Sequence, residues 1–215
     1  MSFESIFPHF NKLPHSVQQT LITHSRLVHY KKGTLISQGQ NECTGLLLVS
    51  NGQLRVYIIS DEGKEVTLYR LFDYDLYLFS ASCMMVSLQF DLLIEAQKDT
   101  DVYIIPANIY QQLMKENLVI ASLTNEIMAS RFTEVMGIID SILFKSLDKR
   151  IAQFLLEEAE LENSNTLKIT HDAIANHLGT AREVVTRLLR YFQNEGSIEL
   201  KRGTITILKP EQLES

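Results

Sequence analysis

The chain has 215 residues, of which 45% are hydrophobic and 21% charged. That length and composition suit two small globular domains with proper cores and exclude a disordered chain. Two cysteines, Cys43 and Cys83, are too few for a disulfide framework or for the four thiolates of an iron-sulfur cage, which favours a cytoplasmic location. We expect neither secretion nor membrane insertion, because the N-terminus lacks a signal-peptide pattern and the most apolar stretch, residues 135–144, is too short to span a bilayer.

The net charge of −6 conceals an asymmetry along the chain. Residues 168–209 contain seven basic and four acidic residues, a surplus of three positive charges, which leaves −9 for the rest. A basic segment on an acidic body is typical of a protein that meets nucleic-acid phosphate with one part of its chain.

The first half of the chain shows a β pattern after two short helical segments, residues 3–10 and 16–25. Short runs rich in Val, Ile, Leu, Tyr and Thr are separated by turn signals such as Asn51-Gly52, a strong hairpin indicator. The predicted strands are residues 26–30, 34–37, 46–49, 53–59, 66–71, 91–95 and 102–105. An antiparallel roll or barrel of about 100 residues is the expected product.

A long helical pattern follows the β region. After Pro106 and a short helix at residues 108–115, apolar residues recur at helical spacing from residue 118 to residue 144. Roughly 30 residues of helix extend about 40 Å, which is more than one small domain covers. We therefore favour a dimerisation helix over the core helix of a bundle. Its expected interface residues are Leu123, Ile127, Val135, Ile138 and Ile142.

A second helix, residues 147–161, precedes a pattern of helix, tight turn, helix and hairpin. Thr170 is placed to cap the first helix of this motif, and Gly179 supplies the left-handed residue that its turn requires. The second helix is expected to bury Val184, Leu188, Leu189 and Phe192. Such a motif places its second helix in the major groove of DNA. The candidate DNA contacts are Thr180, Arg182, Glu183, Thr186, Arg187 and Arg190, with Lys201 and Arg202 at the tip of the hairpin.

These residue types suit base recognition. An arginine fork grips guanine O6 and N7, a glutamate accepts from cytosine N4, and a threonine contacts a thymine methyl group or a phosphate. The alternative is a solvated helix face with ordinary ion pairs, such as Glu183 with Arg187. The capped first helix, the Leu-Gly turn and the basic hairpin favour DNA binding.

From Ile174 to Leu189 the chain reads Ile-Ala-x-x-Leu-Gly-x-x-Arg-Glu-x-Val-x-Arg-x-Leu. This segment resembles the winged helix-turn-helix of the bacterial Crp/Fnr transcription regulators, and the resemblance covers essentially the whole chain. It implies an α+β fold: an antiparallel β-roll of the cyclic-nucleotide-binding type in residues 1–116, a dimerisation helix in 117–145 and a winged helix-turn-helix in 146–215. It also implies a homodimer that reads a palindromic operator through Arg182, Glu183 and Arg187, commonly with RNA polymerase as a further partner.

The effector site departs from that family pattern. Cyclic-nucleotide-binding members carry Gly-Glu-Leu and an arginine pair that clamps the cyclic phosphate, whereas this chain has Tyr74-Asp75-Leu76 and Phe90-Asp91. Because Asp91 would repel a phosphate, we expect no cyclic AMP binding. The N-terminal cysteines of the iron-sulfur branch are missing before Cys43. None of the six histidines lies at metal-site spacing, so neither haem nor another metal cofactor is predicted.

The effector itself stays unidentified at this point. The candidate pocket residues are Asp75, Leu76, Cys83, Phe90 and Asp91. Cys83 is either a redox-active thiol or, with no basic neighbour in sequence to lower its pKa, a buried structural residue. A metal enzyme of the cupin type is not expected, because residues 34–105 contain no histidine. The remaining alternative is a ligand-sensing module that does not bind DNA.

Overall fold

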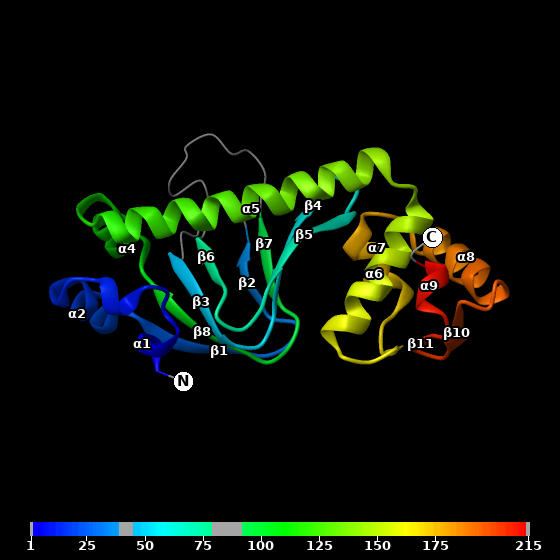
Figure 1. Cartoon of the computed structure of the whole chain (residues 1–215), viewed down its shortest axis with the longest axis horizontal. Helices are drawn as coiled ribbons and strands as arrows, with labels where there is room; N and C mark the ends of the chain where they lie inside the picture. The colour runs from blue at the N-terminus through cyan, green and yellow to red at the C-terminus, as the bar shows by residue number, and fades with distance from the viewer. Residues whose placement is uncertain (1, 39–44, 79–91, 214–215) are drawn as a thin grey trace. The chain divides into compact units, whose positions relative to one another are not determined.

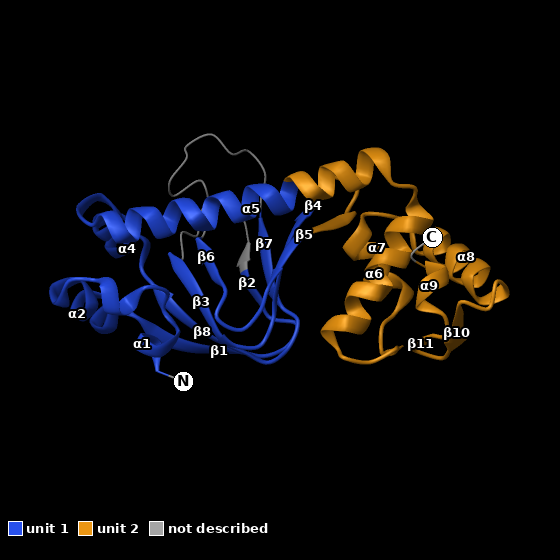
Figure 2. Cartoon of the chain, in the orientation of Figure 1, with its two compact units in different colours: residues 1–58, 68–135 blue, residues 59–67, 136–215 orange. Residues whose placement is uncertain are grey.

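The computed structural model describes residues 2–38, 45–78 and 92–213 (Figure 1). Contacts divide the chain into two units, one comprising Met1–Ile58 with Leu68–Val135 and the other Ile59–Thr67 with Met136–Ser215 (Figure 2). Cys83, Phe90 and Asp91 lie outside the described residues. The division falls within the long helix, whereas the sequence placed boundaries at both of its ends.

The first unit is an antiparallel roll, as predicted. Its described strands form two four-stranded sheets, with the orders β1-β8-β3-β6 and β2-β7-β4-β5. The strands are β1 (Arg26–Tyr30), β2 (Leu35–Gln38), β3 (Leu46–Asn51), β4 (Leu54–Ile59), β5 (Glu65–Leu71), β6 (Leu76–Leu78), β7 (Leu93–Ala96) and β8 (Thr100–Ile105). Before them come α1 (Phe3–Ile6), the 3-10 helix η1 (Phe10–Lys12) and α2 (His15–His24).

Strand β3 shows how two cores are built from one apolar run. Its four residues from Leu46 to Val49 are fully buried. Leu46 and Leu48 pack against residues of α1, α2 and α5, while Leu47 and Val49 face the interior of the roll with Leu54 and the other strand residues. Because successive side chains of a strand point to opposite faces, a strand between two cores is apolar at every position.

Strand β6 and the turn before it were not predicted. Tyr74 has a φ of 74°, a left-handed conformation that glycine adopts without cost, and it stands where cyclic-nucleotide-binding members have glycine. Two carboxylates stabilise this turn: Asp75 accepts from the Phe72 N–H at 2.8 Å, and Asp73 accepts from the Gly52 N–H at 2.7 Å. The turn lacks the glycine that marked the predicted turns, and the aspartates at positions 73 and 75 are a weaker signal.

Helix α5 (Leu118–Phe144) has the predicted bounds and follows α4 (Ala107–Glu116). The side chain of Asn117 caps it by accepting from the N–H groups of Val119 and Ile120, at 3.0 and 3.2 Å. None of the helices within the described ranges has the length and hydropathy needed to cross a membrane.

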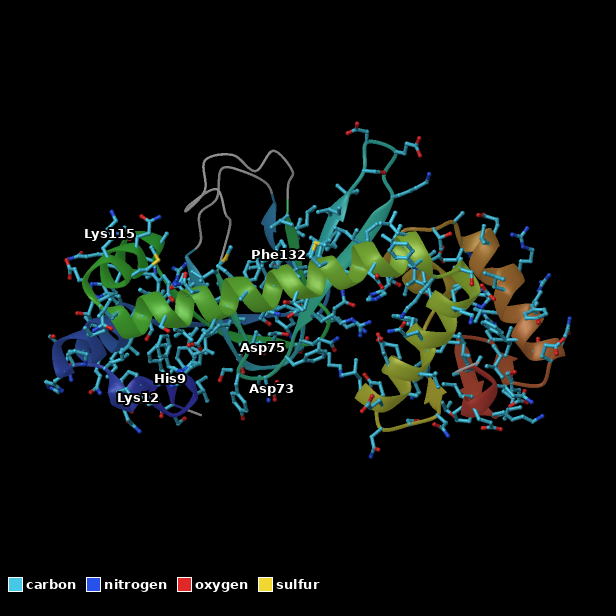
Figure 3. All side chains as sticks on the ribbon, turned by 45° about the horizontal axis from the view of Figure 1, so that its top comes forward. His9, Lys12, Asp73, Asp75, Lys115 and Phe132 are labelled. Carbon is cyan, nitrogen blue, oxygen red and sulfur yellow. The ribbon has the colours of Figure 1, made fainter. Side chains whose placement is uncertain are left out.

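The structure corrects part of the predicted dimer interface. Leu123 is 4% exposed and packs in the core of the first unit, and Ile127 packs against the same core. Val135 and Ile138 are half-buried, and Ile142 is exposed. Helix α5 is apolar on two faces, so its periodicity alone could not separate the face that covers its own protomer from the exposed one. The exposed face carries Met128, Phe132, Met136, Ile139 and Leu143 (Figure 3 labels Phe132).

The second unit holds the winged helix-turn-helix. Its elements are α6 (Leu147–Leu161), β9 (Thr166–Leu167), α7 (His171–Leu178), α8 (Arg182–Asn194), β10 (Ile198–Lys201), β11 (Thr204–Ile207) and α9 (Pro210–Leu213), with the sheet order β10-β11-β9. Helix α8 buries Val185, Leu189 and Phe192, one stripe at spacings of four and three residues. Val184 and Leu188, which we expected in this core, lie at the edge of the stripe and are half-buried.

Candidate nucleic-acid interface

The turn between α7 and α8 is fixed by hydrogen bonds. The Thr170 hydroxyl accepts from the Ala173 N–H at 3.1 Å, which confirms the predicted N-cap. Gly179 ends α7 with a φ of 70°, and the Thr180 N–H donates to the Ala175 carbonyl at 3.0 Å. Arg150 of α6, which the sequence did not single out, donates from Nη2 to the Leu178 carbonyl at 2.8 Å. These bonds fix both ends of α7 and join its C-terminal end to α6, just before α8 begins.

The predicted contact residues of α8 lie on its outer side. Arg182, Glu183, Arg187 and Arg190 are exposed. Glu183 and Arg187 lie opposite the buried stripe, whereas Arg182, in the first turn of the helix, lies closer to the side of Leu189. The Arg182 guanidinium lies 3.4 Å from the Asp172 carboxylate, with about 60% of each side chain exposed. An ion pair so exposed contributes little and is screened by salt, so Arg182 can exchange it for DNA.

Thr186 is in a different environment from its neighbours. It is half-buried, and its hydroxyl lies 2.8 Å from Nδ1 of His171, at the start of α7. Thr180 is also half-buried, within the turn. His171 was not among the predicted site residues, because nothing in the sequence relates it to a residue fifteen positions later.

The hairpin of β10 and β11 carries the predicted basic tip. Gly203 has a φ of 76° and closes the turn beside Arg202, which is exposed. The Lys201 ammonium group lies 2.9 Å from the Glu199 carboxylate, yet 68% of the lysine side chain is exposed. The tip of the hairpin therefore exposes two cationic side chains, Lys201 and Arg202.

We expect Lys201→Ala to weaken binding to every DNA sequence about equally and to reduce the slope of log affinity against log salt by about one unit, because one phosphate contact is lost. The measurement is affinity for operator and random DNA over a range of salt. Lys12→Ala, at an exposed lysine of η1, makes the same change in charge and should leave the slope unaltered. A loss confined to particular sequences would mean that the wing reads bases.

The described part of the predicted effector pocket has structural roles. Asp75 holds its turn through the Phe72 N–H, and Leu76 is 5% exposed in the core shared with α5. The side chain that faces the roll interior is that of Tyr77, the next residue. Within residues 2–38, 45–78 and 92–213, no group of three or more His, Cys, Asp or Glu side chains is placed to hold a metal ion.

A buried polar cluster joins α5 to the roll. The rings of Tyr69 and Tyr77 lie 5.9 Å apart, and the Arg131 guanidinium lies 4.9 Å from the centre of the Tyr69 ring. Arg131 also donates to Glu134 at 2.7 Å and to the Leu76 carbonyl at 3.2 Å. Burial raises the pKa of both phenols, that of Tyr77 to about 12. These tyrosines stay neutral at physiological pH, and Arg131 is the charged link between helix and strand.

Two family models match the chain. The Crp-like helix-turn-helix domain matches residues 149–215, and the cyclic nucleotide-binding domain matches residues 27–117.

Solved structures and curated proteins agree with those matches. A transcriptional regulator of the Crp/Fnr family from Eubacterium rectale is 57% identical, with 98% of each chain covered and a TM-score of 0.94. The cAMP-activated global transcriptional regulator CRP of Salmonella typhimurium is 27% identical over 193 residues, which cover 86% of this chain and 91% of that protein. The c-di-GMP responsive regulator CLP of Xanthomonas campestris shares the fold at 16% identity, with a TM-score of 0.76 over 90% of this chain and 99% of the other.

Proposed function

Because this chain belongs to the Crp/Fnr family of DNA-binding transcription regulators, we propose that it acts as a homodimer that reads a palindromic operator with α8 of each protomer. The observation that carries the proposal is the outer face of α8. Arg182, Glu183 and Arg187 are exposed on a helix whose other face is buried, and their side chains suit guanine and cytosine edges. The same reading assigns the protein to regulation rather than catalysis and to the cytoplasm, where DNA is accessible.

The second protomer is proposed to pack on the exposed face of α5. Met128, Phe132, Met136, Ile139 and Leu143 follow one another at spacings of four, four, three and four residues. These spacings keep the five side chains on one side of the helix without the strict three-four alternation of a coiled coil, and a second copy of the same helix is proposed to cover that side. A two-fold dimer would present two recognition helices to successive major grooves, about 34 Å apart, and thus to a palindrome.

The roll is proposed to hold the regulatory input, from an effector other than cyclic AMP or from a redox signal. Cyclic AMP is not the expected effector, because Asp91 stands where the family has the arginine pair that clamps the cyclic phosphate. The absence of cysteines before Cys43 argues against an iron-sulfur cluster. Arg131, which bonds to β6 and lies over Tyr69 of β5, supports transmission of the signal from the roll to α5. RNA polymerase is a proposed partner of the DNA-bound dimer.

Selection from a random-sequence DNA pool tests the proposal. The purified full-length protein would be incubated with the pool, with and without a thiol oxidant, and the bound fragments sequenced. Enrichment of a palindrome supports the dimeric regulator, and an effect of the oxidant supports a sensing role for Cys83. Enrichment of a single half-site would contradict the dimer, and no enrichment under either condition would favour a ligand-sensing module that does not bind DNA.

A further inference from the structure

His171 lies in the first helix of the helix-turn-helix, and Thr186 lies in the recognition helix. Nδ1 of His171 and the Thr186 hydroxyl oxygen are 2.8 Å apart, a good hydrogen-bond distance, in a half-buried setting. Thr186 follows Arg182 by four residues and precedes Arg190 by four, so it belongs to the same side of α8 as the arginines. A bond between the two helices therefore reaches a side chain on the DNA-facing side.

We propose that His171 is a positioning residue for base recognition, which orients the Thr186 hydroxyl so that its oxygen accepts a hydrogen bond from the amino group of adenine or cytosine. This inference rests on the proposed role of α8 in reading DNA and adds a residue outside that helix to it.

The chemistry of the two ring nitrogens carries the argument. The first helix of this motif crosses the DNA backbone, so a phosphate there would accept from Nε2–H of His171. With its hydrogen on Nε2, the neutral ring has a lone pair on Nδ1 and accepts from the Thr186 hydroxyl. The threonine oxygen then offers lone pairs to a base, and amino groups are the donors in the major groove.

Protonation of His171 reverses this polarity. A protonated ring donates through Nδ1 to the Thr186 oxygen, which frees the hydroxyl hydrogen to donate to thymine O4 or to guanine O6 or N7. In the free protein the pKa of His171 lies below its ordinary value of 6.5, chiefly through burial. The adjacent Arg182 and Arg190 lower it further, and Asp172 opposes them. DNA phosphates favour the cation, so the complex holds more protons than the free protein and binding strengthens as the pH falls.

Two substitutions separate positioning from mere packing. In His171→Asn the amide oxygen stands near the place of Nδ1, so it can accept from Thr186 but cannot titrate. In His171→Gln the amide stands near the place of Nε2, so the bond to Thr186 is lost. His177→Gln removes the other histidine of this unit and is the matched control, because the His177 ring packs 4.5 Å from Phe154. Thermal unfolding verifies that each variant folds.

The experiment is the pool selection repeated at about pH 7.5 and about pH 5.5 with each full-length variant. At the operator position sensitive to Thr186→Val, wild type should prefer adenine or cytosine at neutral pH by about three- to tenfold and shift toward thymine or guanine in acid. His171→Asn should keep the neutral preference at both pH values, His171→Gln should lose it, and His177→Gln should behave as wild type.

The outcomes separate this inference from the function on which it rests. If wild type enriches no palindrome at either pH, the proposed operator reading fails. If a palindrome is enriched but His171→Gln keeps the wild-type preference and its change with pH, the operator reading stands and the role of His171 is overturned. A change with pH that survives in His171→Asn would likewise overturn it.

Discussion

Replacing Ile139 by arginine is expected to yield a folded monomer that binds the operator at least about 100-fold more weakly than wild type. Ile139 lies on the exposed face of α5, 43% exposed, and is in none of the three hydrophobic clusters formed by the described residues, so the protomer should keep its fold. In a symmetric dimer two arginines would face each other in an apolar seam, and the cost of burying them would separate the protomers. A monomer has one recognition helix and binds one half-site. In the dimer, binding of the first half-site holds the second recognition helix at a high effective concentration near the second half-site, and this gain in affinity is lost.

Light scattering would give the mass and titration would give the operator affinity. Thr133→Arg places the same charge on an exposed, polar part of α5, about 100° around the helix from Phe132, and should remain dimeric. A dimeric Ile139→Arg with wild-type affinity would show that α5 does not join the protomers through this face.

Arg187→Ala and Arg182→Ala should each lose about 1 to 3 kcal/mol of discrimination between operator and non-operator DNA, which is about 5- to 150-fold. Each guanidinium can hold the two acceptors of a guanine edge at once, and alanine offers neither bond nor charge. Arg182→Ala also removes the exposed ion pair with Asp172, but this pair should contribute little to the measured free energies. Competition titrations with operator and random DNA at one salt concentration would measure the ratio.

A charge-preserving variant makes this measurement specific. Arg187→Lys keeps the positive charge and loses the planar fork, so it should bind random DNA as wild type does while most of the discrimination disappears. Unchanged discrimination in both alanine variants would remove Arg182 and Arg187 from the role assigned to them.

The sequence predicted those elements whose signals are local. The Thr170 cap, the glycine turn at Gly179 and the bounds of α5 are confirmed, because caps, left-handed residues and periodicity depend on neighbours along the chain. The turn at Tyr74 was missed because it depends on carboxylates and backbone groups rather than on a glycine.

In the candidate site, the sequence did not predict contacts between residues that are far apart along the chain. The outward side of α8 followed from its amphipathic pattern, but the bond between His171 and Thr186 joins two helices, and no sequence spacing encodes it. Likewise Leu123 could be placed on an apolar face, yet only the packing of α1, α2 and α4 decides which face of α5 the protomer covers itself. The spacing of apolar residues thus identifies an apolar helix face, but the fold of the whole chain decides which element packs against it.

Buried phenols give the roll an optical property of its own. The chain has no tryptophan, and burial raises the pKa of four tyrosines of the first unit, Tyr30, Tyr69, Tyr77 and Tyr110, above the ordinary value of 10.0. Since the folded roll holds these protons more tightly than the unfolded chain, the stability that they contribute is present below pH 10 and is lost as the pH rises through their folded values. Above pH 10, where an exposed phenol ionises and a buried one does not, phenolate absorbance therefore reports the opening of the roll without a label.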